Sequence, residues 1–367
     1  MPNTIEKTWE PHAANTPVGP LDFEFRPGLV PGVSFVVDKD SVQAIQIIET
    51  PRLDPSMMAT EAVIPVDGER REKLTRLRAF FDGTHTIREI ATACDWNRDD
   101  CARFIQELYE QAITRDVAAR PVPPLSFYRH IVALGRQETV RALSESPLVE
   151  CMLSGNLTKR LIVGYLVEEY HLVASASSHI SAALTTAPTQ RLRMMFSDYL
   201  SGEYWHCLLL ERGLLAAGLG AEELAASDPL PGTLAVINLM RHSARTDLLA
   251  YSACLSVNEG GDARAAVAFS KMYDLLGTLV APEVLAASRE HAELDFEDQH
   301  ETLGAEPFAE ETILGGPRQD AIYRIVMAAT RTQLEQHRQI AAFYGIPNGP
   351  LAHSYAGADS HSSVLRG

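Results

Sequence analysis

The sequence predicts a mainly α-helical protein, in which a helical bundle is preceded by a small winged-helix-like α+β domain. Helical periodicity is almost uninterrupted after a proline cluster at residues 120–124, whereas short strand-like and helical patterns precede it. The composition is that of an ordinary globular protein, with 46% hydrophobic and 22% charged residues. A chain of 367 residues is long enough for two packed domains.

Changes in composition divide the chain further. Because a proline cluster cannot continue a helix, residues 119–124 are predicted to form a stiff linker. This linker separates an N-terminal arm (1–29) and a winged-helix domain (30–118) from the bundle (125–350). The last segment, 351–367, is rich in Ser, Gly and His, and is predicted to be a flexible tail.

Charge and motifs exclude several classes of function. The net charge of −16 disfavours nonspecific binding to nucleic acids or anionic membranes, because both require a basic surface. No apolar stretch is long enough for a transmembrane helix, and no apolar core of a secretory signal follows Met1. The five cysteines form no CxxC pair, which is typical of reduced thiols, so we expect a cytoplasmic protein. P-loop, GxGxxG and GxSxG motifs are also missing from the sequence.

The winged-helix domain is predicted from two kinds of periodicity. Residues 33–38 and 42–48 alternate like short strands. Leu74, Leu77 and Phe81 then share one helical face, and an Asp-Gly pair ends that helix.

Two more short helices are predicted in this domain from their caps. Thr86 and Glu89 form a capping-box pattern at the start of one helix, and Asn97 caps the other. This last helix carries four acids and only two arginines, whereas a helix that contacts DNA phosphates needs the opposite balance. We therefore expect no nucleic-acid partner.

The stretch LRAFFDGTHTIREI at residues 77–90, followed by FIQELY at 104–109, resembles the peptide-chaperone family of pyrroloquinoline-quinone biosynthesis. The resemblance covers about residues 30–118. It implies a domain that recognises a precursor peptide or a partner protein at a strand edge. A domain that only docks on its neighbour is the alternative, and the residues leave both interpretations open.

After the linker, the periodicity and its breaks predict at least six helices. Asn156 is a candidate cap for the first helix, and Gly and Pro residues separate the others. Six or more helices with short connections indicate an all-α bundle. The helices are expected at about 156–183, 190–217, 231–258, 264–280, 282–300 and 319–344.

Polar residues interrupt these apolar helices at three places. Glu203 and His206 are three residues apart, share a helix face and have apolar neighbours, so that face is expected to be at least partly buried. A buried carboxylate needs a cationic partner. Glu259 ends another helix, where an acid is unfavourable against the helix dipole unless it has a specific partner.

The third place is the helix that begins near Pro282. His291, Asp295 and Asp298 follow one another at i, i+4 and i+7 and form one stripe, whereas His300 falls on roughly the opposite side. A solvated acidic helix is the alternative for this segment by itself. Together, the three segments supply two imidazoles and four carboxylates, a donor set that suits iron or manganese.

The order Glu203-x-x-His206, Glu259, His291-x-x-x-Asp295 resembles the ligand pattern of heme-oxygenase-like diiron oxidases. Two further stretches, PGTLAV from residue 231 and HCLLLE from residue 206, are similar to the wider group that contains pyrroloquinoline-quinone synthase and thiaminase II. The resemblance covers about residues 125–345 and implies a heme-oxygenase-like helical bundle.

For the site, the resemblance implies two Fe2+ ions per chain and O2 as co-substrate, with Glu203, His206, Glu259, His291 and Asp295 as ligands. The family usually has a histidine three residues after the aspartate, where this sequence has Asp298. Asp298 is still a suitable, harder ligand, and His300 is a substitute if the helix is distorted.

The implied activity is that of an iron-dependent oxidoreductase, an O2-activating oxidase or oxygenase. It would act on a small carboxylate- or amine-bearing metabolite in specialised biosynthesis. We also expect a homodimer, and an external electron donor fits this chemistry. The alternatives are a metal-free oxidase like pyrroloquinoline-quinone synthase and a non-catalytic peptide-binding scaffold. Thiaminase chemistry is disfavoured, because Cys207 and Cys254 are expected to be buried and neither is expected beside a clear base.

Other polar residues are candidates for the wall of the pocket. Glu168 and His171 repeat the E-x-x-H spacing on the preceding helix, and His171 is expected in the pocket or behind the ligands. His179 is expected in the core. Tyr165, Tyr199 and Tyr251 are further candidates for the pocket lining. Arg241 and His242 could neutralise a substrate carboxylate.

Overall fold

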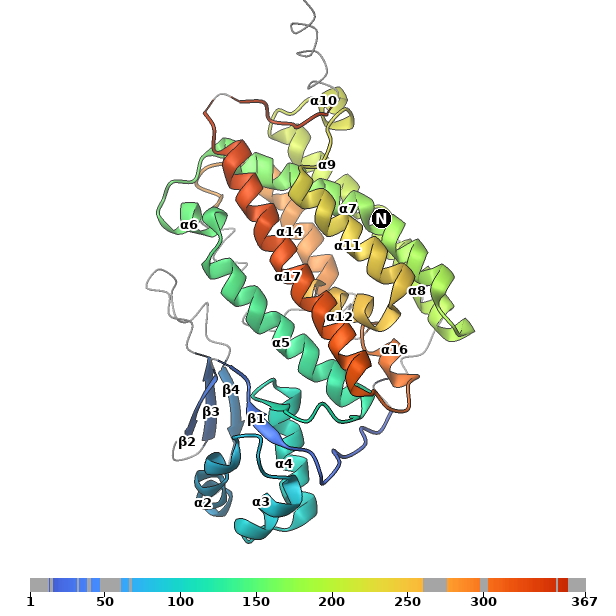
Figure 1. Cartoon of the computed structure of the whole chain (residues 1–367). Coiled ribbons are helices and arrows are strands. Elements are labelled where there is room, and N and C mark those ends of the chain that lie inside the picture. The colour runs from blue at the N-terminus through green and yellow to red at the C-terminus, as the bar shows by residue number, and fades with distance from the viewer. Residues whose placement is uncertain are drawn as a thin grey trace, which may run out of the picture.

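The structure is a computed structural model of the whole chain (Figure 1). The residues that it describes are 13, 16–31, 33–37, 41–46, 61–65, 68–259, 276–297, 303–347 and 349–355.

Among the described residues, the N-terminal domain contains two small antiparallel sheets and three α-helices. Strand β1 pairs with β5 at the end of the domain, and β2, β3 and β4 form the second sheet in that order. This arrangement agrees with the predicted winged-helix-like α+β domain. The elements are β1 (Pro27–Leu29), β2 (Val33–Val37), β3 (Ser41–Gln46), β4 (Glu61–Pro65), α2 (Gly68–Leu77), the 3-10 helix η2 (Arg78–Phe80), α3 (Ile87–Ala93), α4 (Arg98–Glu110) and β5 (Thr114–Asp116).

The predicted caps of this domain are confirmed. The Thr86 hydroxyl accepts from the Glu89 amide, and the Glu89 carboxylate accepts from the Thr86 amide, so the capping box at α3 is complete. At α4, the Asn97 side chain accepts from the amides of Asp99 and Asp100.

The second domain is a bundle in which α17 lies between α5 and α11 (Figure 1). Helix α7 packs on α11 and α17 and also contacts α8 and α9, and α14 packs on α9. The helices are α5 (Pro124–Ser144), α6 (Pro147–Leu153), α7 (Lys159–Thr186), α8 (Gln190–Glu203), α9 (His206–Ala216), α10 (Ala221–Ala225), α11 (Pro231–Thr246), α12 (Leu248–Glu259), α14 (Pro282–Glu297), α16 (Glu306–Ala309) and α17 (Gly316–Tyr344). No helix among these residues is long and apolar enough to cross a membrane.

Three of the predicted bundle helices need correction. The cap of α7 is Thr158, whose hydroxyl accepts from the Leu161 amide, and not Asn156. The helix expected at 190–217 is broken into α8 and α9. The helix expected at 231–258 is broken at Asp247, whose carboxylate accepts from the Ala250 amide and so caps α12. Most of the helix expected at 264–280 lies outside the described residues.

The two domains share one hydrophobic core, because the N-terminal domain docks on α5. The ring of Tyr109 in α4 stacks on that of His130 in α5, with a centroid distance of 4.2 Å and an angle of 2°. His130 Nδ1 also donates to the Tyr109 carbonyl over 2.7 Å. Burial lowers the pKa of His130 to about 4, so this imidazole is neutral at physiological pH. The linker is held as well, since Val122 forms a β-bridge with Leu314.

The anchored part of the chain extends beyond residue 350, where a flexible tail was expected to begin. The His353 carbonyl accepts from the Asp228 amide over 2.7 Å. The Tyr355 amide donates to the Asp228 carboxylate over 2.8 Å. Residues 351–355 therefore pack on the loop before α11, and the rest of the predicted tail lies outside the described residues.

Candidate metal centre

The break between α8 and α9 positions the first two candidate ligands. Glu203 is the last residue of α8 and His206 is the first of α9. His206 Nδ1 lies 3.1 Å from a carboxylate oxygen of Glu203, and both side chains are buried. The preceding Gly202 lowers the helix propensity just before the break, by roughly 1 kcal/mol relative to alanine. The predicted meeting of these two side chains is confirmed, although they do not belong to one continuous helix.

His291 of α14 lies beside the Glu203–His206 pair, with its ring next to that of His206. The rings of His206 and His291 are 5.2 Å apart at their centroids and nearly perpendicular, at 77°. Helices α9 and α14 approach closely because Gly213 has no side chain: a Cβ there would lie 2.9 Å from the Val284 carbonyl oxygen. Small residues between the two helices therefore bring the imidazoles together.

The remaining candidate ligands are not described in the same detail. Glu259 ends α12 and Asp295 lies in α14, but the side chains of both fall outside the described part. Asp298 and His300 lie wholly outside it. Among the described residues, no group of three or more His, Cys, Asp or Glu side chains is placed to hold a metal ion together.

Glu168 of α7 is fully buried, and its hydrogen-bond partners lie at the end of α17 and just before α11. Its carboxylate accepts from the Tyr344 hydroxyl over 2.9 Å and from the Leu230 amide over 3.0 Å. Burial raises the pKa of Glu168, and these two donors oppose the shift. The residue thus joins α7 to the end of α17 and the start of α11.

His171, the second candidate on α7, also contacts the loop before α11. Its Nε2 is 3.0 Å from the Ser227 hydroxyl, in the loop that the C-terminal segment covers. Burial lowers the pKa of His171 to about 4. Both residues thus contact the loop before α11, and their roles in a pocket or behind the ligands stay predictions.

The predicted core position of His179 is confirmed. His179 is buried, and its Nδ1 lies 2.8 Å from the hydroxyl of Tyr251, which is fully buried in α12. Tyr199 of α8 is buried as well. The His179–Tyr251 contact joins α7 to α12, and the ring of Phe196 in α8 lies 6.2 Å from that of Tyr251.

The sequence of the bundle matches a known family. Residues 163–332, which include Glu203, His206, Glu259, His291 and Asp295, match the model of a family described as iron-containing redox enzymes. No curated protein matches the chain in sequence.

A similar solved structure identifies the fold. A domain of unknown function from Shewanella denitrificans OS217, described as having a heme oxygenase-like fold, is 17% identical with a TM-score of 0.50. The match covers 61% of this chain and 95% of that one. The helical domain has the heme-oxygenase-like fold.

Two TenA-like structures are also similar. A TenA homolog from Pseudomonas syringae pv. tomato DC3000 is 12% identical, with a TM-score of 0.47, and the match covers 59% of this chain and 93% of that one. A TenA family transcription regulator from Silicibacter sp. TM1040 is 15% identical, with a TM-score of 0.42, and the match covers 58% and 96%.

The heme-oxygenase-like domain also contains an interior polar cluster that the sequence analysis largely missed. It consists of Glu169 and Tyr165 on α7, His337 on α17 and Ser146 at the cap of α6. The rings of Tyr165 and His337 are 6.5 Å apart, and His337 Nδ1 lies 3.0 Å from the Ser146 hydroxyl. Only Tyr165 was a candidate, because Glu169 follows the more conspicuous Glu168 and His337 stands alone on its helix.

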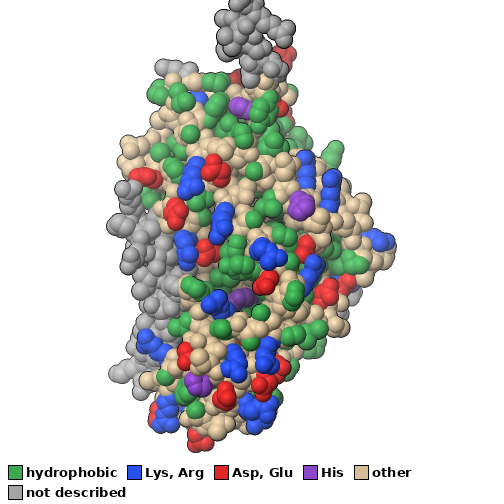
Figure 2. Space-filling view, in the orientation of Figure 1, with side chains coloured by type: hydrophobic (Ala, Val, Ile, Leu, Met, Phe, Trp, Pro, Cys, Tyr) green, Lys and Arg blue, Asp and Glu red, His purple; other side chains and the backbone are tan. Residues whose placement is uncertain are grey.

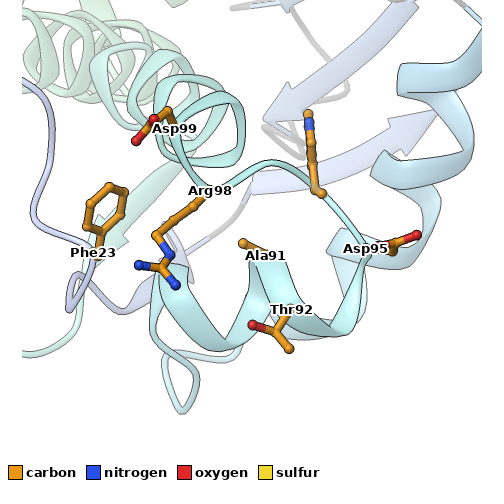
Figure 3. A pocket seen from close by; sticks show the side chains of 7 residues that line it. Phe23, Ala91, Thr92, Asp95, Arg98 and Asp99 are labelled. Atoms are coloured by element: carbon orange, nitrogen blue, oxygen red, sulfur yellow. The ribbon is translucent and has the colours of Figure 1, made fainter.

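The N-terminal domain has a hollow of its own, with a volume of about 470 Å³ (Figure 3). It lies between the arm, α3 and the start of α4, and its lining has no histidine or cysteine. The Arg98 guanidinium lies 5.5 Å from the ring centre of Phe23. The lining residues are Phe23, Ala91, Thr92, Asp95, Trp96, Arg98 and Asp99.

Charges of both signs lie on the face of the molecule that Figure 2 shows. In Figure 2, basic and acidic side chains alternate over the visible face, with no large area of a single sign.

Proposed function

We propose that the heme-oxygenase-like domain is a non-heme diiron oxidase or oxygenase that uses O2 to oxidise a small carboxylate- or amine-bearing metabolite in specialised biosynthesis. The observation that carries the proposal is the buried pair of Glu203 and His206, with His291 facing it, inside the segment that matches iron-containing redox enzymes. One carboxylate and two imidazoles are donors that iron accepts.

Glu203, His206 and His291 would hold part of the iron site, and Glu259, Asp295 and Asp298 would complete it. The family match supports this assignment, since it spans all six residues. Ferrous ions bound there would supply the electrons that reduce O2.

The protein's own residues provide a rigid, dry surrounding for this chemistry. Glu203 and His206 are almost completely buried, so bulk water has little access to them. The bond between His179 and Tyr251 fixes α7 against α12. Side chains that are held in this way keep ligands in place without reorganisation.

For the N-terminal domain we propose binding of a precursor peptide or partner protein. The domain presents a three-stranded sheet and a hollow lined by aromatic and charged side chains, without clustered catalytic groups among its described residues. We further propose that the protein acts as a homodimer in the cytoplasm and receives electrons from an external donor.

Iron analysis of the full chain after anaerobic reconstitution with Fe2+ tests the enzyme proposal. We expect up to two iron ions per chain and a transient visible absorption on exposure to O2. His206→Ala and His291→Ala should each remove iron and abolish the transient, while the exposed His242→Ala serves as the matched control. Folded wild-type protein that retains no iron above background would refute the proposal.

A further inference from the structure

We infer that Trp205 is a positioning residue for His206: its indole ring fixes the orientation of this imidazole in the metal centre and separates it from solvent. The inference rests on the proposed function, because that function assigns His206 to the iron site. It is carried by the ring contacts and the burial of the residues around the break between α8 and α9.

The first observation is that three side chains surround the imidazole of His206. The Trp205 ring meets it edge-to-face, with a centroid distance of 4.8 Å and an angle of 89°. The His291 ring lies 5.2 Å away at 77°, and a carboxylate oxygen of Glu203 lies 3.1 Å from Nδ1. Edge-to-face rings at such distances attract each other beyond the burial of their surface. Of these three neighbours, Trp205 is the one that is not a candidate ligand, and its contact restricts the rotation of the His206 ring.

The second observation is that the helix break creates this contact. Consecutive residues of a regular helix do not face each other, so Trp205 and His206 could not pair within one continuous helix. Trp205 is instead the N-cap residue of α9, directly before His206. The Trp205 carbonyl accepts from the Leu208 amide over 3.0 Å, and the Tyr204 amide donates to the Leu200 carbonyl over 3.0 Å. Hydrogen-bonded turns on both sides of the break therefore fix the backbone from which the indole extends.

The third observation is the change in burial across the break. His206 is 0% exposed and Glu203 is 7% exposed, whereas Tyr204 is 74% and Leu208 is 58% exposed. Trp205 is half-buried: its ring touches the buried imidazole and also reaches the surface. The indole thus covers the solvent side of His206. Excluding water there strengthens the polar interactions of the buried pair.

These observations predict an effect on metal affinity. A ligand that is already oriented loses less freedom when a metal binds, and removing an outer partner of a ligand typically lowers metal affinity about 10–100-fold. Phenylalanine at position 205 keeps an aromatic ring against His206, whereas leucine keeps apolar bulk without a ring. Comparing the two substitutions separates the ring contact from the filling of space.

The first test is the Fe2+ affinity of the full chain in an anaerobic chelator competition. We expect Trp205→Phe to remain within about threefold of the wild type and Trp205→Leu to bind about tenfold more weakly. Trp96→Leu, which replaces a half-buried tryptophan of the N-terminal domain, is the matched control and should bind like the wild type. Circular dichroism checks that each variant is folded, and Trp205→Met replaces Trp205→Leu if the latter is not.

The second test is tryptophan fluorescence during the same titration, which reports the position of the indole directly. Fe2+ should quench the emission of the wild type and of Trp96→Phe, because a paramagnetic ion held by His206 lies close to Trp205. It should not quench Trp205→Phe, although this variant still binds the ion.

Three results would overturn the inference: wild-type affinity in folded Trp205→Leu, equal losses in Trp205→Phe and Trp205→Leu, or equal quenching with and without Trp205. Iron binding that is the same in all variants would refute this inference and leave the proposed function. Folded wild-type protein that binds no Fe2+ would refute the proposed function and this inference together.

Discussion

The buried hydrogen bond between Tyr344 and Glu168 gives a sharp prediction for stability. Tyr344→Phe removes one hydroxyl that donates over 2.9 Å to a fully buried carboxylate. The phenylalanine ring still fills the space against Gly164, where a Cβ would lie 2.1 Å from the Tyr344 ring. The variant therefore leaves packing intact and isolates the loss of one hydrogen bond to a charged group, about 1.5–3 kcal/mol.

The loss should depend on pH in a direction that the structure fixes. Burial raises the pKa of Glu168 above its ordinary value of 4.5, so the folded protein holds this proton more tightly than the unfolded chain. The corresponding stabilisation is complete below 4.5 and is lost as the pH rises through the folded value. Without the Tyr344 donor, the folded pKa of Glu168 rises further, so the variant should lose more stability at about pH 8 than at about pH 5.

Thermal unfolding followed by circular dichroism measures this effect. For a chain of this length that unfolds as one unit, a loss of about 1.5–3 kcal/mol corresponds to a decrease in Tm of about 2–4 °C near pH 8, and the decrease should be smaller near pH 5. Tyr323→Phe, on the same helix but 45% exposed, is the matched control and should shift Tm by no more than about 1 °C. Equal decreases for Tyr344→Phe at both pH values, or a decrease no larger than that of the control, would refute the reasoning.

Three further predictions concern iron and DNA. Asp298→Ala should lose about one of the two proposed irons, whereas His300→Ala should lose none. Loss of iron in His300→Ala but not in Asp298→Ala would mean that the helix carrying His291 is distorted near its end. Arg136 donates to the Ser256 carbonyl over 3.2 Å, in the last turn of α12, which carries the candidate ligand Glu259. Arg136→Gln should therefore weaken Fe2+ affinity about tenfold in a chelator competition, whereas the control Arg141→Gln should not. Equal Fe2+ affinities of the two variants would contradict this prediction. The full chain should show no tight, salt-sensitive binding to duplex DNA in an anisotropy titration.

Local sequence signals predicted much of this fold because they depend on few residues. The capping box of Thr86 and Glu89 and the cap by Asn97 need only side chains within three residues, and both form as predicted. Helix breaks inside a continuous apolar pattern were not predicted. Asp247 breaks one helix because it caps α12 and pairs with Arg318, a partner that lies 71 residues away.

The candidate site shows the same division between local and distant information. The spacing of Glu203 and His206 predicted their contact, since three residues bring two side chains together on a helix and also across this short break. The approach of His291 depends on the packing of α9 against α14, which the resemblance implied and the spacing did not. Glu169 was missed because its setting depends on α17, and no pattern along α7 distinguishes it from Glu168.

The contacts of α5 bear on the role of the N-terminal domain. On one face, α5 carries the stacked and hydrogen-bonded His130, which fixes α4. On another, the Tyr128 hydroxyl donates over 2.9 Å to the hydroxyl of Ser256, three residues before Glu259 ends α12. The N-terminal domain thus supports α5, and α5 in turn holds the last turn of α12, which carries the candidate iron ligand Glu259. Docking and peptide binding are therefore compatible, because the domain packs on α5 through α4, whereas the β2–β4 sheet makes its main contacts within itself and with α2.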